Sequence, residues 1–107
     1  MHISKVELEI PLVSRVAVTG DSLSVELDDG RALSVPLAWF PRLVHGTRTE
    51  RANWRLIGKG LGIHWEALDE DISVENLLAG KPSGESQPSF ERWLASRSAK
   101  KRNPRKR

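Results

Sequence analysis

Residues 23–35 constrain the fold most strongly, because apolar and polar side chains alternate there on both sides of an Asp-Gly pair. The runs 23–27 and 33–35 each place apolar residues at every second position, and Asp29-Gly30 lies between them. A tight turn of this kind needs positive φ angles, which Asp and Gly tolerate better than other residues. We therefore predict an antiparallel β-hairpin over residues 23–35.

The length and composition favour one small domain without disulfides. The chain has 107 residues and no cysteine, which excludes a disulfide scaffold, a cysteine-ligated metal and a cysteine nucleophile. No apolar run approaches the roughly 20 residues that span a bilayer. The first nine residues interleave charged and apolar side chains, unlike a signal peptide. We expect a soluble, cytoplasmic protein that does not contact a membrane.

The rest of the chain predicts short strands and short helices. Alternation predicts strands over 3–10, over 15–19 and in both arms of a second hairpin with a bulged, glycine-rich turn over 54–65. Apolar spacing and capping residues predict helices over 37–45, 48–53 and 73–80, with an acidic loop over 66–71. The expected fold class is α+β: a small, mostly antiparallel sheet of four to five strands, with short helices packed on one side.

Positive and negative charges are distributed unevenly along the chain. The last twelve residues hold seven bases and no acid, whereas the other 95 residues hold ten bases against 14 acids, a net charge of −4. We expect an α+β domain over 1–80, a Pro-, Gly- and Ser-rich linker over 81–88, and a short amphipathic helix with a disordered basic tail over 89–107. The tail either contacts nucleic acid, docks on an acidic protein face or only aids solubility. The seven bases that would contact nucleic acid are Arg97, Lys100, Lys101, Arg102, Arg105, Lys106 and Arg107.

The helix before the basic tail needs a surface to cover its apolar side. Phe90, Trp93, Leu94 and Arg97 fall at helical spacing. Two arrangements satisfy this pattern. The helix either folds back on its own domain, or it docks on a partner or on the second copy of a homodimer.

Candidate sites for cofactors and metals are weak. The glycines of Gly58–Gly62 match neither a phosphate loop nor a dinucleotide loop, so they indicate turn geometry. His2, His45 and His64 lack the spacing of metal ligands. His64 precedes a run of carboxylates and is the one candidate for acid–base chemistry, but a half-buried histidine beside a solvated acidic loop explains the same residues. We predict no catalytic site, no cofactor and no metal.

Four tryptophans and no tyrosine mark the aromatic composition. Tryptophan is rarely fully buried and favours interfaces, because its ring is large and its N–H needs a hydrogen-bond acceptor. The first three tryptophans either pack in the core or line a groove. We predict partner binding by the tryptophans together with the nearby histidine and acids: Trp39, Trp54, His64, Trp65, Asp69, Glu70, Asp71 and Trp93.

Three segments in combination resemble a known bacterial family. They are Trp39–Leu43 (WFPRL), Asn53–Gly58 (NWRLIG) and Gly62–Asp71 (GIHWEALDED), and they are similar to the domain of unknown function 2442 family over about residues 3–80. The resemblance implies a small α+β domain without an agreed activity. Family members are often encoded beside another small protein, in pairs that resemble toxin–antitoxin modules. Some longer relatives append a helix-turn-helix domain, for which the segment after residue 80 is too short here.

Three functions remain, in decreasing order of support. The first is a non-enzymatic binding module, antitoxin-like or regulatory, for a small protein encoded nearby. The alternative is a nucleic-acid-binding protein that acts through its basic C-terminal tail, without sequence preference. The least favoured is an enzyme that uses His64 with the carboxylates between Glu66 and Asp71.

Overall fold

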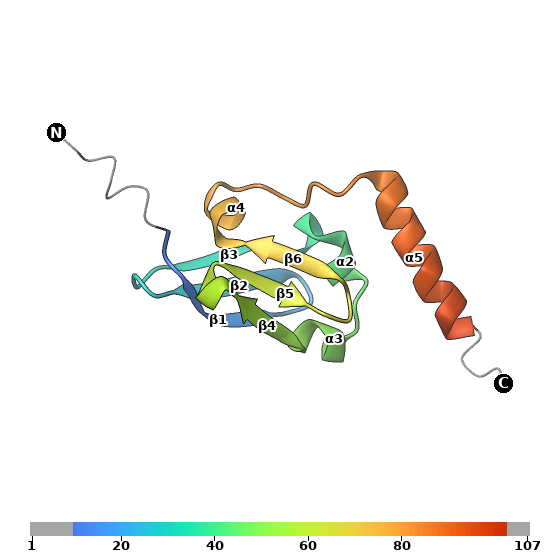
Figure 1. The fold of residues 1–107 in the computed structure, drawn as a ribbon, viewed down its shortest axis with the longest axis horizontal. Coiled ribbons are helices and arrows are strands. Elements are labelled where there is room, and N and C mark those ends of the chain that lie inside the picture. Colours follow the sequence, from blue (N-terminus) through green and yellow to red (C-terminus); the bar gives the residue numbers. More distant parts are fainter. Residues whose placement is uncertain (1–9, 103–107) are drawn as a thin grey trace.

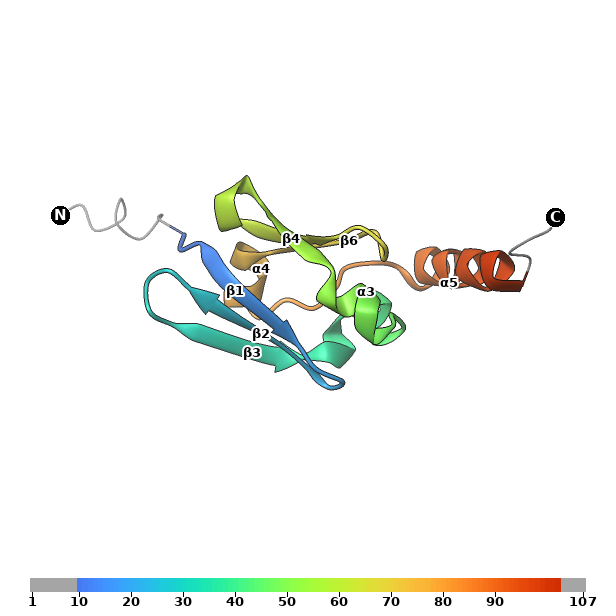
Figure 2. The same ribbon diagram turned by 90° about the horizontal axis from the view of Figure 1, so that it is seen from below.

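Two three-stranded antiparallel sheets form the body of the protein in the computed structural model, which describes residues 10–102 and the side chains up to residue 99. The first sheet has the order β1-β2-β3 and the second the order β4-β5-β6. The two sheets face each other across the core, as Figure 2 shows, and short helices connect them. The strands are β1 (Val13–Val18), β2 (Ser22–Leu27), β3 (Ala32–Pro36), β4 (Trp54–Ile57), β5 (Gly62–Trp65) and β6 (Glu70–Ser73).

The predicted hairpin over 23–35 is confirmed. Strands β2 and β3 pair with Leu23 opposite Val35, and Gly30 adopts a φ of 94° in the turn between them. The predicted strand over 15–19 corresponds to β1, which begins two residues earlier. The predicted strand over 3–10 lies outside the described residues except for Ile10, which is not in a strand.

The α+β class with antiparallel strands is confirmed, but the described residues form six strands in two sheets rather than four to five strands in one sheet. Strand β3 ends at Pro36, and the following helices carry the chain to a separate sheet. The acidic loop over 66–71 is also corrected, because only residues 66–69 form a turn and β6 begins at Glu70. The charged residues Glu70 and Asp71 directly before the buried Ile72 concealed this short strand in the sequence.

The connecting helices follow local sequence signals. The predicted helix over 37–45 is divided into η1 (Leu37–Trp39) and α2 (Pro41–Val44), because Pro41 lacks an N–H and takes the first helical position. Helix α3 (Arg48–Ala52) has the predicted capping box, in which the Glu50 amide donates to Thr47 Oγ1 at 3.1 Å. Helix α4 (Val74–Leu78) is capped by the Ser73 hydroxyl, and η2 (Gly58–Gly60) connects β4 to β5.

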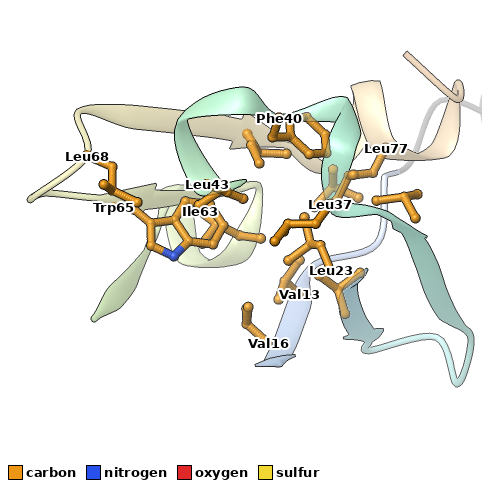
Figure 3. Packing of buried hydrophobic residues seen from close by; sticks show 14 of the residues in the cluster. Val13, Val16, Leu23, Leu37, Phe40, Leu43, Ile63, Trp65, Leu68 and Leu77 are labelled. Carbon is orange, nitrogen blue, oxygen red and sulfur yellow. The ribbon is translucent and has the colours of Figure 1, made fainter. Parts of the chain in front are cut away.

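The core lies between the two sheets and is closed at one side by η1 and α2 (Figure 3). Leu23 comes from the first sheet, Ile63 and Trp65 come from the second, and Leu37 and Leu43 come from the connecting helices. The Trp65 side chain is fully buried, and its indole N–H donates to the Arg51 carbonyl at 3.0 Å. That hydrogen bond satisfies the polar group that makes buried tryptophan costly.

The last element in the described part of the chain is helix α5 (Gln87–Arg102), which lies at one end of the body, beyond both sheets (Figure 1). Residues 81–86 have no regular structure, as the linker composition predicts. The helix is longer than the short one expected from residue 89, since it continues through the first bases of the basic run. Residues 103–107, the end of the predicted tail, lie outside the described part of the chain.

Gly60 is required where η2 approaches β1. Its φ is +113°, and a Cβ there would lie 2.7 Å from the Val13 carbonyl oxygen. We expect Gly60→Ala to lower the free energy of unfolding by about 1–3 kcal/mol, measured by urea denaturation. Gly84→Ala is the control, because a Cβ at Gly84 meets nothing within 4 Å. Equal midpoints for the two variants would contradict the close approach of η2 to β1.

Candidate functional site

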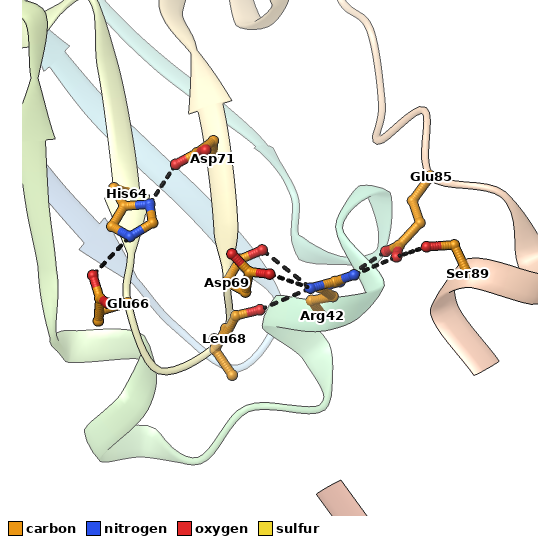
Figure 4. A network of polar contacts seen from close by, with 8 residues as sticks. All are labelled: Arg42, His64, Glu66, Leu68, Asp69, Asp71, Glu85 and Ser89. Carbon is orange, nitrogen blue, oxygen red and sulfur yellow. Dashed lines mark hydrogen bonds and ion pairs between the residues drawn. The ribbon is translucent and has the colours of Figure 1, made fainter. Parts of the chain in front are cut away.

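Arg42 in α2 joins three segments of the chain through one guanidinium group (Figure 4). Its Nε donates to Glu85 Oε1 at 2.9 Å and its Nη2 to Glu85 Oε2 at 2.5 Å, a two-pronged ion pair with the linker. Its Nη1 donates to the carbonyl oxygens of Leu68 at 3.2 Å and Asp69 at 3.1 Å in the β5–β6 turn. The Arg42 side chain is only 13% exposed and that of Glu85 15%, so both charges depend on these partners.

The Glu85 carboxylate in the linker accepts hydrogen bonds from both Arg42 and Ser89. The Arg42 guanidinium lowers the pKa of Glu85, and the Ser89 hydroxyl, which donates to Glu85 Oε2 at 2.7 Å, lowers that pKa further. Ser89 lies in the first turns of α5. Glu85 therefore connects the domain to the start of the helix.

Trp93 is the aromatic centre of the contact between α5 and the body. The guanidinium carbons of Arg42 and Arg97 lie 5.0 Å and 4.8 Å from the centre of its ring. Phe90 stacks against the same ring, with 5.7 Å between centroids, and meets the His45 ring edge-on at 5.3 Å. Cation–π contacts of this geometry stabilise by about 0.5–2 kcal/mol each. The helix thus folds back on its own domain.

Arg97 completes the docking of α5. Its Nη2 and Nη1 donate to Glu50 Oε1 at 3.0 Å and Oε2 at 3.2 Å, and Nη2 also contacts the His45 carbonyl oxygen at 3.3 Å. Arg97 lowers the pKa of Glu50, and the Thr47 amide lowers it further. Arg97 was predicted to contact nucleic acid, but its guanidinium forms an internal ion pair with Glu50.

His64 lies on the outward face of the second sheet, between two carboxylates. Its Nδ1 bonds to Asp71 on the neighbouring strand, and its Nε2 lies 2.9 Å from Glu66 Oε1, which is also 3.6 Å from Arg55 Nη2. Asp71 and then Glu66 raise the pKa of His64. When both ring nitrogens donate to carboxylates, the imidazolium has no free lone pair to accept a proton. The arrangement is a salt-bridge network across β4, β5 and β6.

Glu70 lies near Arg42, and its pKa differs from the ordinary value of a glutamate. Burial raises its pKa to about 7, against the opposing effect of Arg42 and with further increases from Glu85, Asp71 and Asp69. A carboxyl group with a raised pKa binds its proton more tightly in the folded state. The contribution of Glu70 to the free energy of unfolding is therefore largest at pH values below its ordinary pKa of 4.5, and it is lost as the pH rises through about 7.

The residues predicted to bind a partner do not form one surface. Trp65 is fully buried, so it is a core residue, and Trp39 and Trp54 are half-buried against the same core. Trp93 and Asp69 line a cavity of about 480 Å³ between α5 and the body. His64 and Asp71 lie on the outer face of the second sheet, whereas Glu70 is half-buried.

The residues that hold α5 were missed in the sequence. The sequence marks Glu50 only as a capping-box residue, and it does not predict the pairing of Glu50 with Arg97 or of Arg42 with Glu85, because these partners are 47 and 43 positions apart. Of the predicted phosphate-binding bases, Lys100, Lys101 and Arg102 lie in the last turn of α5. Arg105, Lys106 and Arg107 lie outside the described residues.

Residues 10–102 contain no group of three or more histidine, aspartate or glutamate side chains placed to hold a metal ion. Within the same range, none of the helices has the length and apolar character needed to cross a membrane.

Comparison with known proteins places the body of the chain in a family. The model of the family described as "Protein of unknown function (DUF2442)" matches residues 13–83, which confirms the resemblance stated above. A crystal structure of a protein of unknown function from Rhodospirillum rubrum has a similar fold, with a TM-score of 0.63 and 23% sequence identity. The match covers 74% of this chain and 98% of that one. Curated proteins gave no match to the sequence.

The His64 network makes stability depend on pH in a defined direction. The pKa of His64 in the folded protein is raised above its ordinary value of 6.5. The contribution of His64 to the free energy of unfolding is therefore complete at pH values below 6.5, and it is lost as the pH rises through the folded pKa. We expect the difference in urea midpoint between the native chain and His64→Gln to be larger at pH 6 than at pH 9. His45→Gln is the control. An NMR titration midpoint for His64 at or below 6.5 would contradict the network.

Proposed function

Because the chain belongs to the DUF2442 family, which has no assigned activity, we propose from its geometry that it is a non-enzymatic binding module. Helix α5 follows the family-matched residues 13–83 and is docked on them by Arg42, Glu85, Trp93 and Arg97. The module presents the basic end of this helix to a cytoplasmic partner. That partner is a small protein with an acidic face, encoded nearby, and the role is antitoxin-like or regulatory.

The position of the docking contacts supports this proposal. The last residue of α5 that contacts the body in these interactions is Arg97, and the helix continues to Arg102. At about 1.5 Å per residue, the three bases 100–102 extend roughly 5–8 Å past that contact. A docked helix of this kind offers a preorganised cationic end, which lowers the entropy lost on binding.

The state of His64 supports a non-enzymatic role. A general base needs a ring nitrogen with a free lone pair close to the substrate proton. Both His64 nitrogens are engaged by Asp71 and Glu66, and these carboxylates raise the pKa of the ring. The network is better suited to fastening three strands together than to proton transfer.

Nucleic acid is the second candidate partner, favoured by the absence of any acid in the last twelve residues. With Arg97 committed to Glu50, six bases of this segment remain for phosphates. Each phosphate contact on duplex DNA steepens the log–log dependence of affinity on salt by roughly 0.9. Binding of this kind does not distinguish DNA sequences.

Removal of the tail charges tests the proposal directly. The product of the neighbouring gene is co-expressed in one experiment with the native chain and in another with a variant. In the variant, six bases become Gln: Lys100, Lys101, Arg102, Arg105, Lys106 and Arg107. We expect the native chain to co-elute with that product in size-exclusion chromatography and the variant to lose the complex, because the cationic end is gone. A parallel anisotropy titration with duplex DNA at 50–200 mM salt measures the second candidate.

A matched control variant tests whether the position of the bases matters or only the net charge of the chain. Six exposed bases elsewhere become Gln in the control, which leaves the same net charge: Arg15, Arg31, Arg55, Lys59, Lys81 and Arg92. The control should keep the complex. If neither the neighbouring protein nor DNA binds the native chain, or if both variants bind equally well, the proposed function is wrong.

A further inference from the structure

A second cationic feature lies on the body, separate from the basic end of α5. A cavity of about 410 Å³ lies between the β1–β2 turn and α3. It is lined by Val18, Thr19, Gly20, Arg48, Arg51 and Ala52. Two of these six residues are arginines and none is acidic, on a body whose net charge is negative. The nearest acid in the turn, Asp21, accepts a hydrogen bond from the Thr19 hydroxyl at 3.0 Å.

One arginine of the cavity is fixed and the other is available. Arg51 donates from Nε to the Leu43 carbonyl oxygen and from Nη2 to the Val44 carbonyl oxygen, both at 2.9 Å, which holds its guanidinium in place. Arg48 is exposed, and residues 10–99 supply it with no hydrogen-bond or ion-pair partner. The two residues are three positions apart on α3 and therefore share a helix face.

The β1–β2 turn leaves room for a ligand beside these arginines. The Thr19 hydroxyl accepts hydrogen bonds from the amides of Asp21 at 3.3 Å and Ser22 at 3.0 Å, so the turn has a fixed shape. A Cβ placed on Gly20 would meet nothing within 4 Å. A ligand can thus approach the backbone at Gly20 closely.

We propose that this cavity binds a phosphate group beside Arg48 and Arg51. An anion in this cavity is attracted by both cationic residues that line it. Guanidinium matches the geometry of phosphate oxygens through paired N–H donors. The phosphate belongs either to a small phosphorylated molecule or to a nucleic-acid backbone. The site uses no residue of α5, so it stands independently of the proposed function.

NMR titration of the full chain with sodium pyrophosphate tests the site, with sodium chloride at equal ionic strength as the reference. We expect the largest amide shifts at Thr19, Gly20 and α3. Arg48→Ala should weaken pyrophosphate binding by about tenfold or more, and Gly20→Glu should abolish it by placing a carboxylate at the opening. Arg31→Ala and Gly20→Ala are the matched controls for charge and for backbone, and both should bind like the native chain.

The outcomes separate the site from the tail and one phosphate source from the other. Shifts confined to the last residues of the chain, or equal binding by Arg48→Ala and Arg31→Ala, would overturn the proposal. The variant with six neutral tail residues should keep the pyrophosphate shifts at Gly20, whatever happens to its partner binding. Shifts at the same cavity with duplex DNA would assign the phosphate to a nucleic-acid backbone. Shifts with pyrophosphate alone would assign it to a small phosphorylated molecule.

Discussion

The two-pronged ion pair between Arg42 and Glu85 is the interaction on which the arrangement of the C-terminal third depends. Arg42 is held by α2, which begins at Pro41 and is anchored in the core by Leu43. The same guanidinium contacts the β5–β6 turn and the ring of Trp93. Loss of one partner would leave the other charge mostly buried and unpaired, which is costly. The linker and α5 are therefore held by the body rather than tethered loosely to it.

Most side chains that look chemically active in this sequence are used within the protein itself. His64 is held by Asp71 and Glu66, and Arg97 is paired with Glu50. Two cationic features are left that these internal pairs do not use. They are the basic end of α5 and Arg48 in the cavity beside the β1–β2 turn. Both proposals concern anionic ligands for this reason.

Local features of the fold were predictable from the sequence, and long-range ones were not. The Asp29-Gly30 turn, the Thr47–Glu50 capping box and the Ser73 cap each depend on residues a few positions apart. Alternation predicts strands but does not decide which strands share a sheet, so it does not distinguish one sheet from the two that form. For the candidate site, helical spacing identified Trp93, and the capping box identified Glu50 but not its pairing with Arg97. Arg42 and Glu85 carry no local signal that predicts their ion pair. Alternation also left the burial of Trp65 open, because a core position and a groove position have the same pattern.

Backbone ¹⁵N relaxation of the native chain tests most directly whether α5 is docked on the body. If the contacts of Arg42, Trp93 and Arg97 hold the helix, the amides of residues 89–97 should have order parameters near 0.85, like those of β2. They should also tumble with the same correlation time as the sheets. Order parameters below about 0.6 from residue 83 onward, or a separate and faster correlation time for α5, would contradict the docked arrangement.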